Sequence, residues 1–259
     1  MQTTIQSEIR NCSMTEYFLT TNKSTPVIVI CPGGAYQWRS DRESAPVANA
    51  FNKKGYHAVV LNYNLEAEEL LDGPLLDLSW AVSHLRSHAK EYQIDPEKII
   101  VCGFSAGGHL AASLGVFWSD QSRFPSEEIR SLHKPNGLIL CYPVISAFEH
   151  AHVGSFLRLS KDKKIRESYS LETKVSSDVP PCFIWHTMTD NSVSFYNSLL
   201  FAEALKKHEV SCELMIFPKG SHGLSLATKE VEDESHKRIA DAHVARWFDQ
   251  CIDWISYSL

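Results

Sequence analysis

The chain has 259 residues, of which 44% are hydrophobic and 22% are charged, and its formal net charge is −6 at pH 7. This is the composition of a globular protein, and a chain of this length can bury about three quarters of its unfolded surface in one domain. Lysine and arginine are scattered rather than clustered, so we expect no nucleic-acid partner. No apolar run is long enough to span a membrane.

The N-terminal sequence lacks the basic start and apolar stretch of a signal peptide, so we expect a cytoplasmic location. The seven cysteines include no C-x-x-C pair, and several lie in strand-like runs, which favours reduced cysteines in the core. Cysteines and histidines show no zinc-ligand spacing, so we expect no metal. The oligomeric state stays open, a homo-oligomer included.

Short apolar runs alternate along the chain with segments of helical periodicity. This alternation predicts a single α/β domain over residues 1–259, with a mostly parallel sheet and helices on both faces. One or two short edge strands are expected in the first twenty-five residues. The further strands are expected at 27–31, 57–61, 98–102, 137–142, 181–186 and 212–217, and the helices at 75–92, 105–118, 195–207 and about 230–257.

Ser40 and Glu43 have the spacing of a capping box, which predicts the start of a further helix that ends at Gly55. The segment 146–179 interrupts the alternation, because it contains no strong strand and is rich in lysine and arginine over 158–166. Its place beyond a strand end favours a small lid or cap over the site, although a solvated surface excursion fits equally well.

The stretch from Gly103 to Gly108 matches the G-x-S-x-G pattern, in which a sharp strand-to-helix turn exposes a serine. The pattern alone also fits a glycine-rich turn, but an apolar strand precedes it and a helical pattern follows it. Glycines beside the serine leave room for close backbone contacts around a strained residue. We therefore expect Ser105 to be a nucleophile.

A serine nucleophile needs a base and a carboxylate that orients this base. Around a serine turn of this kind, the acid and then the base follow in the chain, each on a loop after a later strand. Asp190 and His222 occupy these places. Asp178 lies on the wrong side of its strand, and His186 and His109 are more typical of structural histidines.

The oxyanion of an acyl-transfer reaction needs preorganised N–H donors, one after the nucleophile and another from an early strand-to-helix loop. Ala106 is expected to supply the first, and Gly34, or else Ala35, the second. Tyr36 and Trp38 follow in the same loop and are expected to form a wall of the substrate pocket, although aromatic residues near a loop are as often packing residues.

Five motifs occur in a familiar order: Cys-Pro-Gly-Gly-Ala-Tyr, Asp-Arg-Glu, Gly-Phe-Ser-Ala-Gly-Gly-His, Trp-His-Thr-Met-Thr-Asp and Gly-Ser-His-Gly-Leu. From about Val27 to Trp254, the chain resembles the α/β-hydrolase superfamily, specifically the bacterial acetyl esterase, acetylxylan-esterase-like or sugar hydrolase group. The resemblance implies the same triad and the same oxyanion donors. The lipase-type loop begins His-Gly-Gly-Gly, whereas Cys31 to Ala35 reads Cys-Pro-Gly-Gly-Ala, which leaves the second donor open.

The resemblance also implies small O-acylated substrates, particularly acetylated sugars. The expected function is therefore that of a serine carboxylesterase, which works through an acyl-enzyme and needs no cofactor. The same groups could cleave amides, so an arylformamidase or a small peptidase is the alternative. A non-catalytic binding protein is the third hypothesis, because one fold can host many functions.

Overall fold

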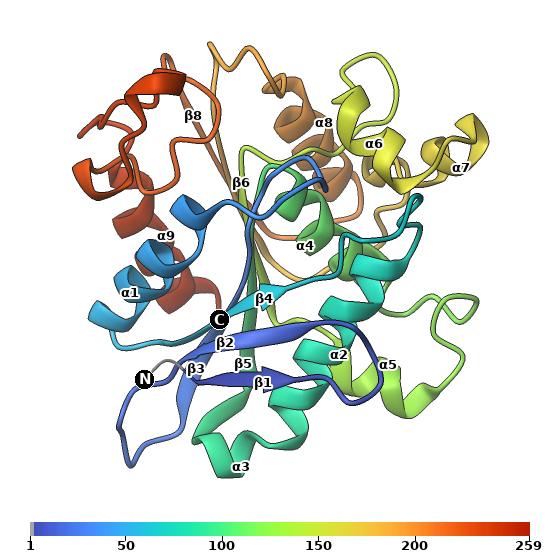
Figure 1. The fold of residues 1–259 in the computed structure, drawn as a ribbon, viewed down its shortest axis with the longest axis vertical. Helices are drawn as coiled ribbons and strands as arrows, with labels where there is room; N and C mark the ends of the chain where they lie inside the picture. Colours follow the sequence, from blue (N-terminus) through green and yellow to red (C-terminus); the bar gives the residue numbers. More distant parts are fainter. Residues whose placement is uncertain (1–2) are drawn as a thin grey trace.

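The computed structural model describes residues 3–259, whose strands form one eight-stranded sheet (Figure 1). The strand order is β1-β2-β4-β3-β5-β6-β7-β8. Strands β4 to β8 run parallel to β3, whereas β1 and β2 form an antiparallel extension beside β4. The strands are β1 Thr4–Gln6, β2 Ser13–Tyr17, β3 Thr25–Cys31, β4 His57–Asn62, β5 Ile94–Phe104, β6 Gly137–Cys141, β7 Cys182–Thr187 and β8 Cys212–Phe217.

The central strands are apolar along their length because helices cover both faces of the sheet. In β3, Val27 and Val29 belong to the core on one face, and Ile28 and Ile30 belong to the core on the other. Successive side chains of a strand point to opposite faces, so one continuous apolar run serves both cores. This arrangement confirms the expected sheet and its buried parallel strands.

Helices α1 and α9 pack on one face, and α2, α4 and α8 pack on the other (Figure 1). Shorter helices and 3-10 turns lie in the connections. The helices are α1 Ala45–Lys53, α2 Gly73–Ser87, α3 Ala89–Tyr92, α4 Ala106–Phe117, α5 Glu127–His133, α6 Val153–Leu159, α7 Lys163–Ser168, α8 Tyr196–Lys207 and α9 Arg246–Ser258, and the 3-10 turns are η1 Asp41–Glu43, η2 Leu171–Thr173, η3 Lys229–Val231 and η4 Glu234–His236.

The prediction of a long last helix is wrong, because regular helix begins only at Arg246. The segment before it contains the two short turns η3 and η4, and the backbone of Asp233 pairs with that of Arg238. Most of residues 232–243 are exposed or half-buried, so this charged stretch has no apolar face with which to join a core helix. The short helix α5 was not predicted, although the Ser126 side chain caps it by accepting from the N–H of Ile129.

The segment 146–179 carries α6, α7 and η2, and its basic residues are not all solvated. The guanidinium group of Arg158 donates to the backbone oxygens of Leu65 and Glu68, each at 2.9 Å. The backbone of Arg158 in turn accepts from the N–H of Leu70 at 2.9 Å. These bonds fix α6 to the connection between β4 and α2.

All seven cysteines are free, and six of them are buried. Burial raises the pKa of the Cys31 and Cys182 thiols well above the usual value, so these side chains behave as small apolar core residues. Among residues 3–259, no helix combines the length and the apolar character that crossing a bilayer requires.

Candidate active site

Ser105 lies in the sharp turn between β5 and α4, at the carboxyl end of the parallel strands. Its φ is 53° and its ψ is −118°, a conformation that L-residues rarely adopt. Glycine is required nearby: a Cβ at Gly103 would lie 2.1 Å from the Gly107 oxygen, and a Cβ at Gly107 would lie 2.0 Å from the Cys31 oxygen. The turn can therefore form only with glycine at these two positions.

The three residues expected from the sequence lie in one chain of hydrogen bonds. The Ser105 hydroxyl is 2.8 Å from His222 Nε2, and His222 Nδ1 is 2.7 Å from Asp190 Oδ2. Asp190 follows β7 and His222 follows β8, so both come from the edge of the sheet at which β5 ends at Ser105. With the Nδ1 proton directed to the carboxylate, Nε2 is free to accept the serine proton.

The carboxyl group of Asp190 is buried, with a side-chain exposure of 1%. Burial would raise its pKa, but hydrogen bonds from His186 and His222 hold the pKa well below the usual value, so the group stays ionised. Its other oxygen accepts from the N–H groups of Ser192 and Val193, each at 2.9 Å. His186 is fully buried and also bonds to the Ser198 hydroxyl at 2.8 Å. His186 therefore helps to hold the carboxyl group of Asp190 in position. The alternative acid, Asp178, is exposed and precedes β7.

Backbone N–H groups beside Ser105 are available for an oxyanion. Within residues 3–259, the N–H groups of Gly34, Ala35 and Ala106 donate to no protein acceptor. The N–H of Gly33 is not available, because it donates to Glu43 Oε2 at 2.8 Å. The loop holds a positive φ at Gly34 and Ala35, 127° and 55° respectively. Both of the loop donors that the sequence left open therefore stay candidates.

Glu43 has a different role from the one expected. The predicted capping box is wrong, because Ser40 makes no side-chain cap and α1 begins only at Ala45. The carboxyl group of Glu43 instead points inward: one oxygen accepts from Gly33, and the other accepts from the Tyr142 hydroxyl at 2.7 Å. Burial, with the nearby Glu43, raises the pKa of Tyr142 well above its usual value, so the phenol keeps the proton that it donates.

We expect Glu43→Gln to lower kcat by roughly 10- to 100-fold, because the amide cannot accept from both Gly33 and Tyr142 and the oxyanion loop shifts. Steady-state kinetics on 4-nitrophenyl acetate measure this effect. Glu172→Gln is the matched control, since the carboxyl group of Glu172 accepts from the hydroxyl of Ser170, two residues before it. An unchanged kcat in Glu43→Gln would contradict a role for Glu43 in positioning this loop.

A cavity of about 170 Å³ lies over Ser105 and His222. Trp38 lines this cavity and is 57% exposed. Tyr36 departs from the expectation: it is only 2% exposed and does not line the cavity. Its hydroxyl bonds to His109 Nδ1 at 2.9 Å, so Tyr36 anchors the loop after β3 to helix α4.

His109 connects Tyr36 to the segment 146–179, since its Nε2 atom is 3.0 Å from the backbone oxygen of Tyr169. Burial lowers the pKa of His109 from 6.5 to about 4, which keeps the ring neutral. The unfolded chain therefore binds this proton at a higher pH than the folded chain. Stability falls as the pH decreases from 6.5 to about 4, by a total on the order of 3 kcal/mol from this group.

We expect His109→Gln to flatten this acid-dependent loss while lowering stability at neutral pH. Urea unfolding between pH 4 and pH 7 gives the free energy of unfolding of both proteins. His236→Gln, on an exposed turn, provides the control. If the free energy of unfolding depends on pH in the same way in His109→Gln and in the unsubstituted protein, His109 is not the buried, neutral group proposed here.

The sequence interpretation missed several residues that line the cavity. They come from four different loops, and no local pattern joins them. They are Ser40, Glu43, His152, Ser192, Gly223 and Arg238. Glu43 carried a usable signal, since it lies in the Asp-Arg-Glu motif that contributed to the resemblance, but only the folded chain reveals its partners.

The mostly parallel sheet, with a serine turn after β5 and an acid and a base after β7 and β8, defines an α/β-hydrolase. The chain belongs to the BD-FAE family, whose model matches residues 17–205.

Two curated relatives are similar to most of the chain. Endo-1,4-beta-xylanase B of Butyrivibrio fibrisolvens is 36% identical over 209 residues, which cover 78% of this chain and 33% of the relative. Acetylxylan esterase of Xylanibacter ruminicola is 32% identical over 220 residues, which cover 82% of this chain and 43% of the relative. The chain therefore spans less than half of the length of either relative.

A solved structure extends the similarity over nearly the whole fold. The acetyl ester-xyloside bifunctional hydrolase of Caldicellulosiruptor lactoaceticus has a TM-score of 0.85 and 40% sequence identity, with coverage of 95% of this chain and 88% of that one. This similarity agrees with the α/β-hydrolase fold and with the group that the sequence motifs indicated.

Proposed function

We propose that the protein is a serine carboxylesterase that removes small acyl groups, acetyl above all, from sugars or related alcohols. The observation that carries this proposal is the hydrogen-bonded chain from Ser105 through His222 to Asp190. Beside it lie the backbone N–H groups of Gly34, Ala35 and Ala106, which donate to no protein acceptor within residues 3–259. The names of two relatives, an acetylxylan esterase and an acetyl ester-xyloside hydrolase, support the acetyl group and the sugar.

The reaction proceeds through two acyl transfers. His222 accepts the hydroxyl proton of Ser105 as the oxygen attacks the ester carbonyl, and Ala106 with Gly34 or Ala35 stabilises the oxyanion. The protonated His222 then gives this proton to the departing alcohol, which leaves an acyl-serine. Water attacks the acyl-serine with His222 again as base, and the acid is released. No step draws on a cofactor.

The size of the cavity favours a short acyl group. Its volume of about 170 Å³ is below the roughly 300–1,000 Å³ of pockets for drug-sized ligands. The segment 146–179 contributes His152 to the lining, and we propose that this segment acts as a cap of a single catalytic domain.

Rates on matched acyl donors test this function. We expect 4-nitrophenyl acetate to be cleaved with a higher kcat/KM than 4-nitrophenyl octanoate, and acetate to be released from acetylated xylo-oligosaccharides. An N-formyl anilide and a prolyl peptide are compared in the same assay. A preference for either of these amides would overturn the esterase assignment in favour of an amide hydrolase.

A further inference from the structure

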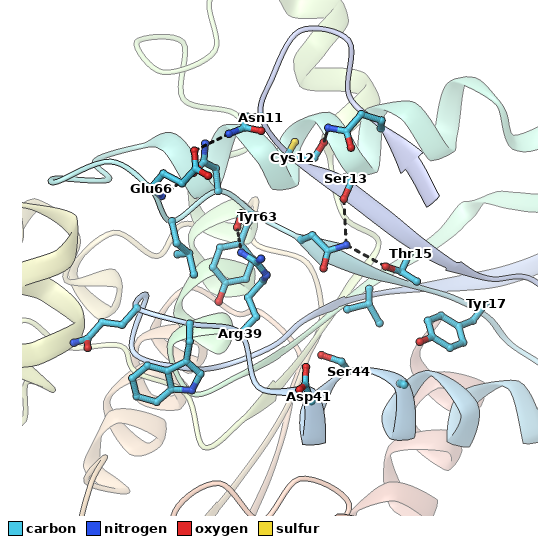
Figure 2. Close-up of a pocket in the computed structure, with 18 residues that line it drawn as sticks. Asn11, Cys12, Ser13, Thr15, Tyr17, Arg39, Asp41, Ser44, Tyr63 and Glu66 are labelled. Atoms are coloured by element: carbon cyan, nitrogen blue, oxygen red, sulfur yellow. Dashed lines mark hydrogen bonds between the residues drawn. The ribbon is translucent and has the colours of Figure 1, made fainter. Parts of the chain in front are cut away.

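A second hollow of about 880 Å³ lies beside the catalytic cavity, and the two share the side chain of Trp38. Figure 2 shows Ser13 and Thr15 of β2 on one side of this groove, and Asp41 and Ser44 on the opposite side. The antiparallel extension of the sheet thus forms one wall. The mechanism described above makes no use of this groove.

The groove is lined with polar groups that the fold holds in place. The amide nitrogen of Asn62 donates to the hydroxyl groups of Ser13, at 3.2 Å, and Thr15, at 3.0 Å. Arg39 donates one N–H to the backbone oxygen of Tyr63 at 2.7 Å, and a guanidinium group has five donors in all. Figure 2 shows these bonds and the position of Arg39 between the walls.

The charge and the polarity of the groove lining exclude two classes of ligand. Its charged side chains are Arg39, Asp41 and Glu66, one positive and two negative, so it offers no basic surface for phosphate groups. Its walls are mainly polar, so it does not suit a lipid chain. A neutral ligand with many hydroxyl groups fits best, because each hydroxyl both donates to carboxyl groups and accepts from Arg39.

Trp38 supplies the aromatic surface that such a ligand also needs. An indole has a flat apolar face, against which the C–H groups of a sugar ring can pack. Its side chain is 57% exposed, and it lines both the groove and the cavity over Ser105. A ligand that passes Trp38 can therefore occupy both spaces at once.

We propose that this groove binds the saccharide chain that carries the ester, while the acyl group reaches Ser105 on the other side of Trp38. The inference rests on the proposed esterase function and names the part of the substrate that lies outside the catalytic cavity. Contacts to this remote part orient the ester, so their loss lowers the rate on long substrates more than on small ones.

Binding is tested in the Ser105→Ala protein, so that the result does not depend on hydrolysis. The probe is an unacetylated β-1,4-xylo-oligosaccharide, titrated by calorimetry. We expect Arg39→Ala and Asp41→Ala, each added to Ser105→Ala, to raise the Kd of this probe by about tenfold or more, which is the effect of losing one hydrogen-bonded contact to a charged group. Tyr257→Ala, which removes a 92% exposed side chain on α9, is the control.

The same groove substitutions are then measured in the active protein. We expect the ratio of kcat/KM on an acetylated xylo-oligosaccharide to kcat/KM on 4-nitrophenyl acetate to fall by about tenfold. An unchanged Kd together with an unchanged ratio would overturn the groove as a saccharide site. If the unsubstituted protein cleaves neither ester, the proposed function fails instead, and the calorimetric result still judges the groove.

Discussion

Replacing Ser105 with alanine is expected to lower kcat on 4-nitrophenyl acetate by about a million-fold, because the chain then has no nucleophile in reach of His222. The Ser105 hydroxyl is the group that His222 Nε2 contacts at 2.8 Å. Unfolding curves should remain cooperative, since alanine removes one oxygen from a turn held by its neighbours. The residual rate comes from the oxyanion donors and from binding alone.

Covalent labelling separates loss of the nucleophile from loss of the fold. A fluorophosphonate should add one phosphonyl group to the unsubstituted protein and none to Ser105→Ala, which mass spectrometry detects. Ser122→Ala, an exposed serine on a loop, is the control and should label fully. Activity of Ser105→Ala within tenfold of the unsubstituted rate would contradict the nucleophile assignment.

The second large effect is expected for Asp190→Asn, with a loss of about ten thousand-fold in kcat. The N–H groups of Ser192 and Val193 bind Oδ1, so the amide oxygen keeps that place and the amide nitrogen faces His222. Its N–H then donates to Nδ1 and drives the histidine proton to Nε2. In this tautomer His222 cannot accept the proton of Ser105.

Steady-state kinetics over a range of pH give the size of this loss. The control is Asp178→Asn, which changes the other carboxylate next to β7 and should leave the rate within about twofold, because exposed positions away from a site have small effects. An Asp190→Asn protein with more than a tenth of the unsubstituted kcat would show that another group orients His222.

The sheet could be predicted because each of its central strands is marked by a local pattern in the sequence. The apolar runs at 27–31, 57–61 and 181–186 are short, β-branched or aromatic, and bounded by turn residues, and each is a strand in the structure within a few residues. The order of serine, acid and base along the chain predicted Ser105, Asp190 and His222. They follow β5, β7 and β8, and the structure brings their side chains together.

Features that depend on distant partners could not be predicted in this way. Glu43 fits a capping box by spacing, but its carboxyl group is drawn inward by Gly33 and Tyr142, which is 99 residues away. The place of Tyr36 in the sequence, near Trp38, is typical of a pocket residue, but its hydroxyl forms a buried hydrogen bond with His109. Tertiary packing determines whether a side chain bonds to a nearby or to a distant partner, and the spacing of residues along the sequence carries no information about this packing.

The backbone of Ser105 has a consequence for how stable this protein can become. Its φ of 53° would suit glycine better than serine, so the turn holds a residue that weakens the fold. Glycine there would relieve the strain and remove the hydroxyl at the same time. At this position, a change that raises stability abolishes activity. Higher thermal stability must therefore come from residues outside the turn between β5 and α4.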